Sequence, residues 1–128
     1  MRHEELYIES RKYLNVIGGY FLPYRMVMKG ELTFNQALDI SIKQSSDHQP
    51  HRVTMLIDLY FPELKKEFIE VMAIRDRLNE LVNGYKEQYK TGNHDGSKWL
   101  ELFQPDLELF CKKASKFEDS IAALSHDV

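Results

Sequence analysis

Apolar residues recur at helical spacing through almost the whole chain. The clearest stripe lies in the last quarter, where steps of four and three residues alternate and keep one helix face apolar for about six turns. Its members are Phe103, Leu107, Phe110, Ala114, Phe117, Ile121 and Leu124. Such a face must be covered by other helices, so the pattern predicts an all-α fold.

Three features interrupt or end the first stripe, which covers residues 3–29. The adjacent Gly18 and Gly19 cost roughly 2 kcal/mol together relative to alanine, and Pro23 removes an intrahelical donor. We therefore expect a kink near residues 18–23. Gly30 is expected to end the helix.

A capping pattern predicts where the second helix begins. Thr33 offers a hydroxyl to the backbone, and Gln36 follows three residues later, as in a capping box. The short amphipathic helix that starts here should end near Ser46. Residues 45–50 are polar and end in a proline, so they are expected to form a loop.

Pro62 interrupts the longest stripe, residues 51–90, and periodicity leaves two structures open because the apolar spacing continues through the proline in register. The helix either bends there, or the chain turns at Phe61–Pro62. The residue before a proline avoids the α region and Pro followed by Glu63 begins a helix well, so a turn is possible. The turn is favoured because it gives segments of similar length, as an antiparallel bundle requires.

A turn at Pro62 divides the chain into four segments of similar length. They are residues 3–29, residues 33–46 with 51–61, residues 62–90 and residues 97–125. The predicted fold is an antiparallel four-helix bundle with proline-kinked helices, in a single domain of residues 1–128. Residues 91–96 form the last loop, Ser97 is expected to be the N-cap of the final helix, and Pro105 to interrupt that helix early.

Composition excludes several classes of function. With 17 Lys and Arg against 20 Asp and Glu, the net charge is −3, so we expect no nucleic-acid partner. The longest uncharged run, residues 13–24, is shorter than the roughly 18 apolar residues of a membrane-spanning helix.

Cys111 is the single cysteine and lies within the last stripe, which predicts an inert core or boundary residue in a reducing compartment. We expect a cytoplasmic protein, with tethering to the cytosolic face of a membrane, through an anchor outside this chain, as the alternative.

The sequence contains no pattern typical of a catalytic, metal or cofactor site. It has no Glu-x-x-His pair and no glycine-rich phosphate loop. The five histidines fall at the termini or in predicted loops: His3, His48, His51, His94 and His126. We therefore expect neither enzymatic activity nor a bound cofactor.

Two arginines and five aromatic residues remain as candidates. Arg25 and Arg75 interrupt apolar faces, where a guanidinium must be paired, for instance with Asp58 or Glu101, or must reach water past its own methylenes. Tyrosine and tryptophan suit half-buried surfaces, because the ring packs while the polar tip stays wet. The candidate ligand or partner surface consists of Tyr20, Tyr24, Arg25, Arg75, Tyr85, Tyr89 and Trp99.

Two functions follow from these candidates. The first is a non-catalytic interaction or regulatory domain, whose apolar, tyrosine-rich helix face docks to another protein or to a second copy. The alternative is a sensing bundle that holds a small anion or amphiphile between its helices, with Arg25 and Arg75 as the charge partners.

Overall fold

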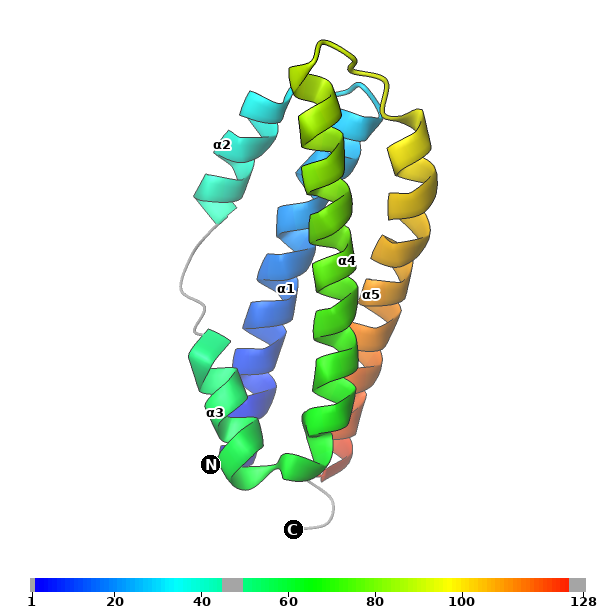
Figure 1. The fold of residues 1–128 in the computed structure, drawn as a ribbon. Coiled ribbons are helices and arrows are strands. Elements are labelled where there is room, and N and C mark those ends of the chain that lie inside the picture. The colour runs from blue at the N-terminus through cyan, green and yellow to red at the C-terminus, as the bar shows by residue number, and fades with distance from the viewer. Residues whose placement is uncertain (1, 45–49, 125–128) are drawn as a thin grey trace.

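The computed structural model describes residues 2–44 and 50–124, and within them the chain is all-α, as predicted. These residues form five α-helices and one short 3-10 helix (Figure 1). In chain order they are α1 (Arg2–Met28), α2 (Phe34–Gln44), α3 (Pro50–Tyr60), η1 (Pro62–Leu64), α4 (Lys65–Lys90) and α5 (Ser97–Leu124). Among the described helices, none combines the length and the hydropathy needed to span a bilayer.

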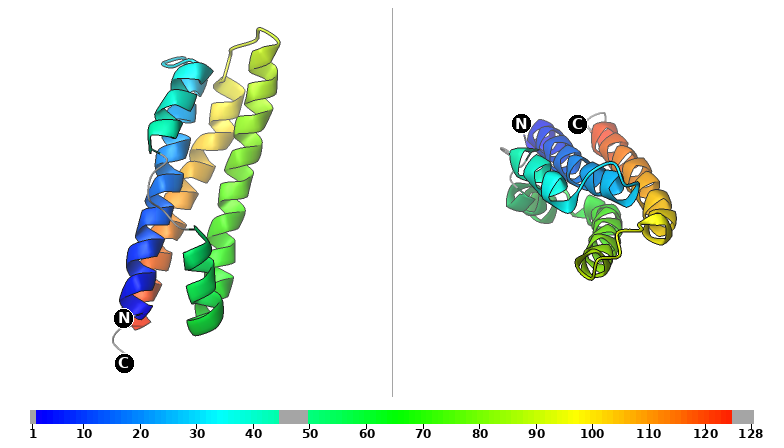
Figure 2. Two further views of the ribbon diagram at one scale, coloured as in Figure 1. Left: turned by 90° about the vertical axis from the view of Figure 1, so that its left-hand side faces the viewer. Right: turned by 90° about the horizontal axis from the view of Figure 1, so that it is seen from above.

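Consecutive elements run up and down the molecule. In Figure 1, α1 ascends, α2 and α3 descend beside it, α4 ascends and α5 descends. α5 packs against both α4 and α1, whereas α2 and α3 pack mainly against α1. Figure 2 shows α2 and α3 lying along one flank of the three long helices. We call α4 and α5 together the hairpin, and α2 and α3 together the arm.

The hydrophobic core is built largely by the three long helices. All members of the predicted α5 stripe are buried except Leu124, which is half-buried. Phe103 meets Phe21 of α1 with ring centroids 6.0 Å apart, and Phe117 meets Phe68 of α4 at 5.6 Å. The stripe therefore lies against both neighbouring helices, as its width predicts.

α1 runs unbroken through the glycine pair and Pro23. A proline ring clashes with the carbonyl one turn earlier, and here that carbonyl belongs to Gly19, which has no side chain to hinder a small backbone adjustment. The predicted helix stop is confirmed. Gly30 adopts a left-handed φ of 80°, and the N–H of Glu31 donates to the carbonyl of Met26, which closes the C-terminus of α1.

The chain turns at Phe61–Pro62, which confirms the favoured alternative. α3 ends at Tyr60, Phe61 leaves the helical region with φ −136° and ψ 53°, and Pro62 opens η1. η1 leads directly into α4. The restriction that a proline places on its preceding residue thus separates the arm from the hairpin.

Both ends of α2 can be compared with the sequence. The predicted capping box is present: the N–H of Gln36 donates to Thr33 Oγ1 at 3.2 Å, and the N–H of Thr33 donates to Gln36 Oε1 at 2.9 Å. α2 reaches Gln44, the last described residue before the gap, and the predicted end near Ser46 lies outside the described residues. Of the predicted loop at 45–50, residues 45–49 lie outside the described residues, and Pro50 is the first residue of α3.

Two predictions for α5 are wrong. Pro105 does not interrupt the helix, which is continuous from Ser97 to Leu124. Pro105 and Glu101 one turn earlier are exposed, so water can satisfy the carbonyl that the missing N–H leaves free. Ser97 is not the N-cap either. The carbonyl of Gly96 accepts the first helical bond, from Leu100, while Ser97 donates both its N–H and its hydroxyl to Asp95 Oδ1.

Candidate functional site

Five of the seven candidate residues belong to one group of packed aromatic rings. The ring centroids of Tyr20 and Tyr24 on α1 are 5.1 Å apart. On the hairpin, Tyr85 lies 5.8 Å from Tyr89 and 6.4 Å from Trp99. The group lies toward the end of the molecule where α4 and α5 are joined (Figure 1).

Phe34 of α2 joins these two sets of rings. Its ring centroid lies 5.9 Å from Tyr24, 5.4 Å from Tyr85 and 4.8 Å from Tyr89. We call the six residues the aromatic cluster: Tyr20, Tyr24, Phe34, Tyr85, Tyr89 and Trp99. Sequence reasoning left Phe34 out of the candidate surface. The capping box was the available signal, because it fixes Phe34 in the first turn of α2 and hence beside the last turns of α1.

Burial separates the tyrosines of the cluster into two kinds. Tyr24 and Tyr85 are only 6% and 0% exposed, so they belong to the core. The Tyr85 hydroxyl donates to the carbonyl of His94 at 2.6 Å and lies 3.3 Å from that of Val27, which links the 91–96 loop to the end of α1. Burial also raises the pKa of Tyr85. In this conformation the rings that can meet a partner are therefore those of Tyr20, Phe34, Tyr89 and Trp99.

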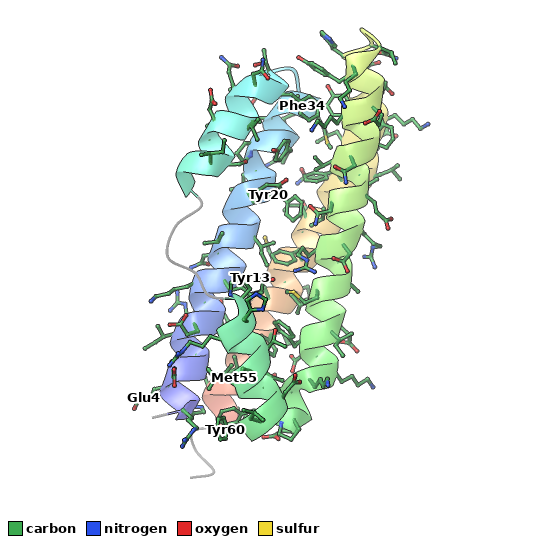
Figure 3. The ribbon with its side chains drawn as sticks, turned by 60° about the vertical axis from the view of Figure 1, so that its left-hand side comes forward. Glu4, Tyr13, Tyr20, Phe34, Met55 and Tyr60 are labelled. Atoms are coloured by element: carbon green, nitrogen blue, oxygen red, sulfur yellow. The ribbon has the colours of Figure 1, made fainter. Side chains whose placement is uncertain are left out.

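Tyr20 lies at the edge of the cluster and remains 37% exposed. Figure 3 shows it on the side of α1 that faces α4, below Phe34. Partial burial and the neighbouring Tyr24 raise the pKa of Tyr20 to about 12. Like an ordinary tyrosine, it is neutral near pH 7, so the side chain can contact an apolar surface without desolvating a charge.

Trp99 and Tyr89 are held in place by contacts within the hairpin and its loop. The Trp99 ring lies directly on Gly84, where an added Cβ would come within 2.6 Å of the indole. Its Nε1–H donates to Gln88 Oε1 at 2.8 Å. The Tyr89 ring stacks on His94 with centroids 3.8 Å apart and an interplanar angle of 13°.

The structure does not bring Arg25 and Arg75 together. Arg75 donates to the hydroxyl of Tyr13 at 2.8 Å and pairs with Asp76 at 2.9 Å, rather than with Asp58 or Glu101. Arg25 lies half-buried in the last turn of α1. Residues 13 and 25 are separated by about 18 Å along the helix axis, so the two guanidinium groups cannot hold one small anion.

A cleft of about 390 Å³ opens beside the aromatic cluster, between the first turn of α2 and the last turns of α4. It is lined by Thr33, Phe34, Asn35, Lys86, Tyr89 and Lys90. Two ammonium groups beside two aromatic rings provide charge and apolar contact for an anion that has an apolar part.

α2 exposes two of its three large aliphatic side chains, while the third, Ile40, is half-buried. Among its described side chains, Ala37 and Ser41 are buried, whereas Leu38 is 50% and Ile42 62% exposed. Leu38 and Ile42 are four residues apart and therefore share one face of the helix. As α2 descends from the cluster it diverges from α4 (Figure 1). α2 packs on α1, where Tyr20 is also exposed, and we call Tyr20, Leu38 and Ile42 together the apolar edge.

The described residues contain no group of three or more His, Cys, Asp or Glu that could hold a metal ion. His51 lies in the first turn of α3 rather than in a loop, and His48 and His126 lie outside the described residues. Cys111 is exposed, contrary to the prediction, because it is one residue beyond the buried Phe110 and thus about 100° around the helix. No protein-family model, no curated protein and no solved structure matches this chain.

Proposed function

We propose that this chain is a non-catalytic interaction domain that binds a partner protein through its apolar edge. The observation that carries the proposal is that α2 buries small residues and exposes large apolar ones. Ala37 and Ser41 are buried, whereas Leu38 and Ile42 are exposed to water. Fully burying a Leu or Ile side chain contributes about 1.5–3 kcal/mol, so a partner that covers both would recover much of this energy. Tyr20 extends the edge onto α1 with a neutral, half-buried ring.

The partner that fits this edge is an amphipathic helix. Side chains four residues apart form a ridge, which packs into the groove of another helix. We also propose that α2 and α3 act together as the fourth member of an antiparallel four-helix bundle. Each has 11 residues, or about 16 Å of helix, so the two cover most of the 27-residue α1.

We place this activity in the cytoplasm. Cys111 is free and exposed on α5. An exposed thiol of this kind persists in a reducing compartment and is oxidised outside it.

Site-specific photocrosslinking in cells tests the interaction. A photoreactive amino acid at position 42 should give a discrete crosslinked product, and the matched label at the exposed Lys112 of α5 should not. Adding Leu38→Glu to the label at position 42 should abolish the product, while circular dichroism shows that the helices are retained. A product of twice the subunit mass would identify a second copy as the partner. Equal crosslinking from positions 42 and 112, or none from either, would contradict the proposal.

The second candidate function is binding of a small anion that has an apolar part. It is favoured by the cleft that brings Lys86 and Lys90 beside the rings of Phe34 and Tyr89. The test is the mass of the purified protein under native and then denaturing conditions. Extra mass that is lost on denaturation, and that Lys86→Gln with Lys90→Gln reduces, would support this candidate; a bare chain mass would leave the interaction domain as the better proposal.

A further inference from the structure

α2 is held on α1 by few and small side chains. The residues that it buries fully, Ala37 and Ser41, offer little apolar area, and Ile40 between them is only half-buried. The Ser41 hydroxyl is buried without a hydrogen-bond partner among the described residues, which disfavours docking further. The equivalent face of α5 buries three phenylalanines. The free energy that keeps α2 in place is therefore much smaller than that of the hairpin.

Phe34 supplies the largest apolar contact between α2 and the rest of the molecule. Its ring touches Tyr24 of α1 and both Tyr85 and Tyr89 of α4. Since the contact lies in the first turn of α2, the remainder of the helix depends on it for its attachment to α4. Figure 3 shows Phe34 at the upper end of α2, between this helix and α4.

The ends of α1 and α2 are capped independently of each other. The C-terminus of α1 is closed by its own bonds from Gly30 and Glu31. The N-terminus of α2 is closed by the capping box between Thr33 and Gln36. The backbone between the N–H of Glu31 and the N–H of Thr33 takes part in neither cap, so a rotation there can separate the helices without breaking either one.

Moving α2 away would uncover the buried half of the aromatic cluster. Phe34 covers Tyr24 and Tyr85, the two tyrosines that are almost inaccessible in the closed molecule. The space that Phe34 leaves is already shaped for a helix that presents an aromatic ring, because α2 itself occupies it. An apolar, tyrosine-rich surface is thus present in the fold and covered by α2.

We propose that α2 opens as a unit, anchored by Phe34 when closed, and that the open molecule accepts a partner helix whose aromatic side chain takes the place of Phe34. The second part goes beyond the proposed function, because its partner takes the place of α2 on α1 and α4, whereas the apolar edge includes the exposed face of the closed α2. The first part concerns this chain alone. The two parts are therefore tested by separate measurements.

Hydrogen exchange followed by mass spectrometry tests the opening. In the full chain, amides of residues 38–44 should exchange at least about 100-fold faster than those of residues 107–117. Phe34→Ala should accelerate exchange in α2 by roughly a further 10- to 100-fold and leave α5 unchanged, while Leu38→Ala should change neither. If Phe34→Ala does not fold, Phe34→Leu should show a smaller acceleration confined to α2. Equal protection of α2 and α5 in the unaltered chain, or equal acceleration of both, would overturn the opening.

A synthetic peptide with the sequence of residues 31–44 tests the acceptance of a helix. It should bind the Phe34→Ala protein, in which α2 is loosened, and not the unaltered chain, in which α2 competes from within. The same peptide with alanine in place of phenylalanine should bind about 100-fold more weakly. Failure of the peptide to bind, with α2 shown by exchange to be open, would overturn the partner site; the crosslinking at position 42 would still decide the proposed function.

Discussion

The hairpin and the arm contain similar amphipathic helices but bury them to different extents. α4 and α5 each bury phenylalanine and long aliphatic residues of their own apolar stripes, which face each other. α3 buries Val53, Leu56 and Ile57, whereas α2 fully buries only an alanine and a serine among its described side chains and leaves Phe34 and Ile40 half-buried. Amphipathic spacing therefore predicts that a segment is helical, but the size of the residues at the contact determines how strongly it is held.

The largest expected effect comes from removing a ring of the hairpin core. Phe117 is completely buried and packs on Phe68, so Phe117→Ala should lower the free energy of unfolding by about 3–5 kcal/mol. Leu38→Ala in the arm should lower it by less than about 1 kcal/mol, because half of that side chain is already in water. Urea denaturation measures both. Similar losses for the two variants would show that α2 is as firmly held as the hairpin.

A pair of glycine substitutions gives effects of opposite sign. At Gly96, an added Cβ would lie 2.5 Å from the carbonyl oxygen of Met28, and backbone on both sides leaves no flexible atom to move aside. Gly96→Ala should therefore destabilise the protein by roughly 1–3 kcal/mol. Gly18 of α1 has no atom within 4 Å of its added Cβ, so Gly18→Ala should stabilise it by about 1 kcal/mol. Thermal unfolding of both variants tests the contrast.

Removing the hydroxyl of a buried tyrosine in the aromatic cluster should destabilise the protein more than removing the hydroxyl of a half-buried one. Tyr85→Phe leaves the carbonyls of His94 and Val27 without this donor, and should cost roughly 1–2 kcal/mol of unfolding free energy. Tyr89→Phe keeps the stacked ring and should change it by less than about 0.5 kcal/mol. Chemical denaturation measures the unfolding free energy of both variants. A larger loss for Tyr89→Phe than for Tyr85→Phe would contradict the role of Tyr85 as the link between the 91–96 loop and α1.

The smallest effect is expected at alkaline pH. Because the pKa of Tyr20 is raised from 10.0 to about 12 in the folded state, the folded protein favours the neutral phenol over the phenolate. Its contribution to stability is complete below pH 10 and is lost as the pH rises toward 12. Unfolding free energies measured at pH 9 and pH 11 should therefore fall less in Tyr20→Phe than in the unaltered chain. An identical fall in both would show that Tyr20 ionises normally.

Much of the fold was predictable because its determinants are local. The strict stripe of α5, the capping box of Thr33 and Gln36, the left-handed Gly30 and the restriction imposed by Pro62 all act within a few residues. Pro23 and Pro105 were harder to interpret. Their effect depends on whether the freed carbonyl is hydrated and on the residue one turn earlier, which are properties of the folded surroundings.

The candidate site was predictable only in part. The tyrosine pairs lie together at one end of the molecule, but their spacing could not distinguish a buried ring such as Tyr85 from an exposed one such as Tyr20. Arg25 and Arg75 interrupt apolar faces in the same manner, yet they lie at different heights along the helices. Which side chains meet across two helices depends on how far one helix is shifted along its axis relative to the other. A single sequence does not specify this shift.

The position of Trp99 has a spectroscopic consequence. It is the single tryptophan of the chain, and it rests on Gly84 with its indole N–H on Gln88, so all of these contacts lie within the hairpin. Tyr85, 6.4 Å away, is close enough to transfer excitation to it. The intrinsic emission of this protein therefore reports on the hairpin, and a movement confined to α2 would leave the tryptophan band nearly unchanged while the tyrosine contribution varied.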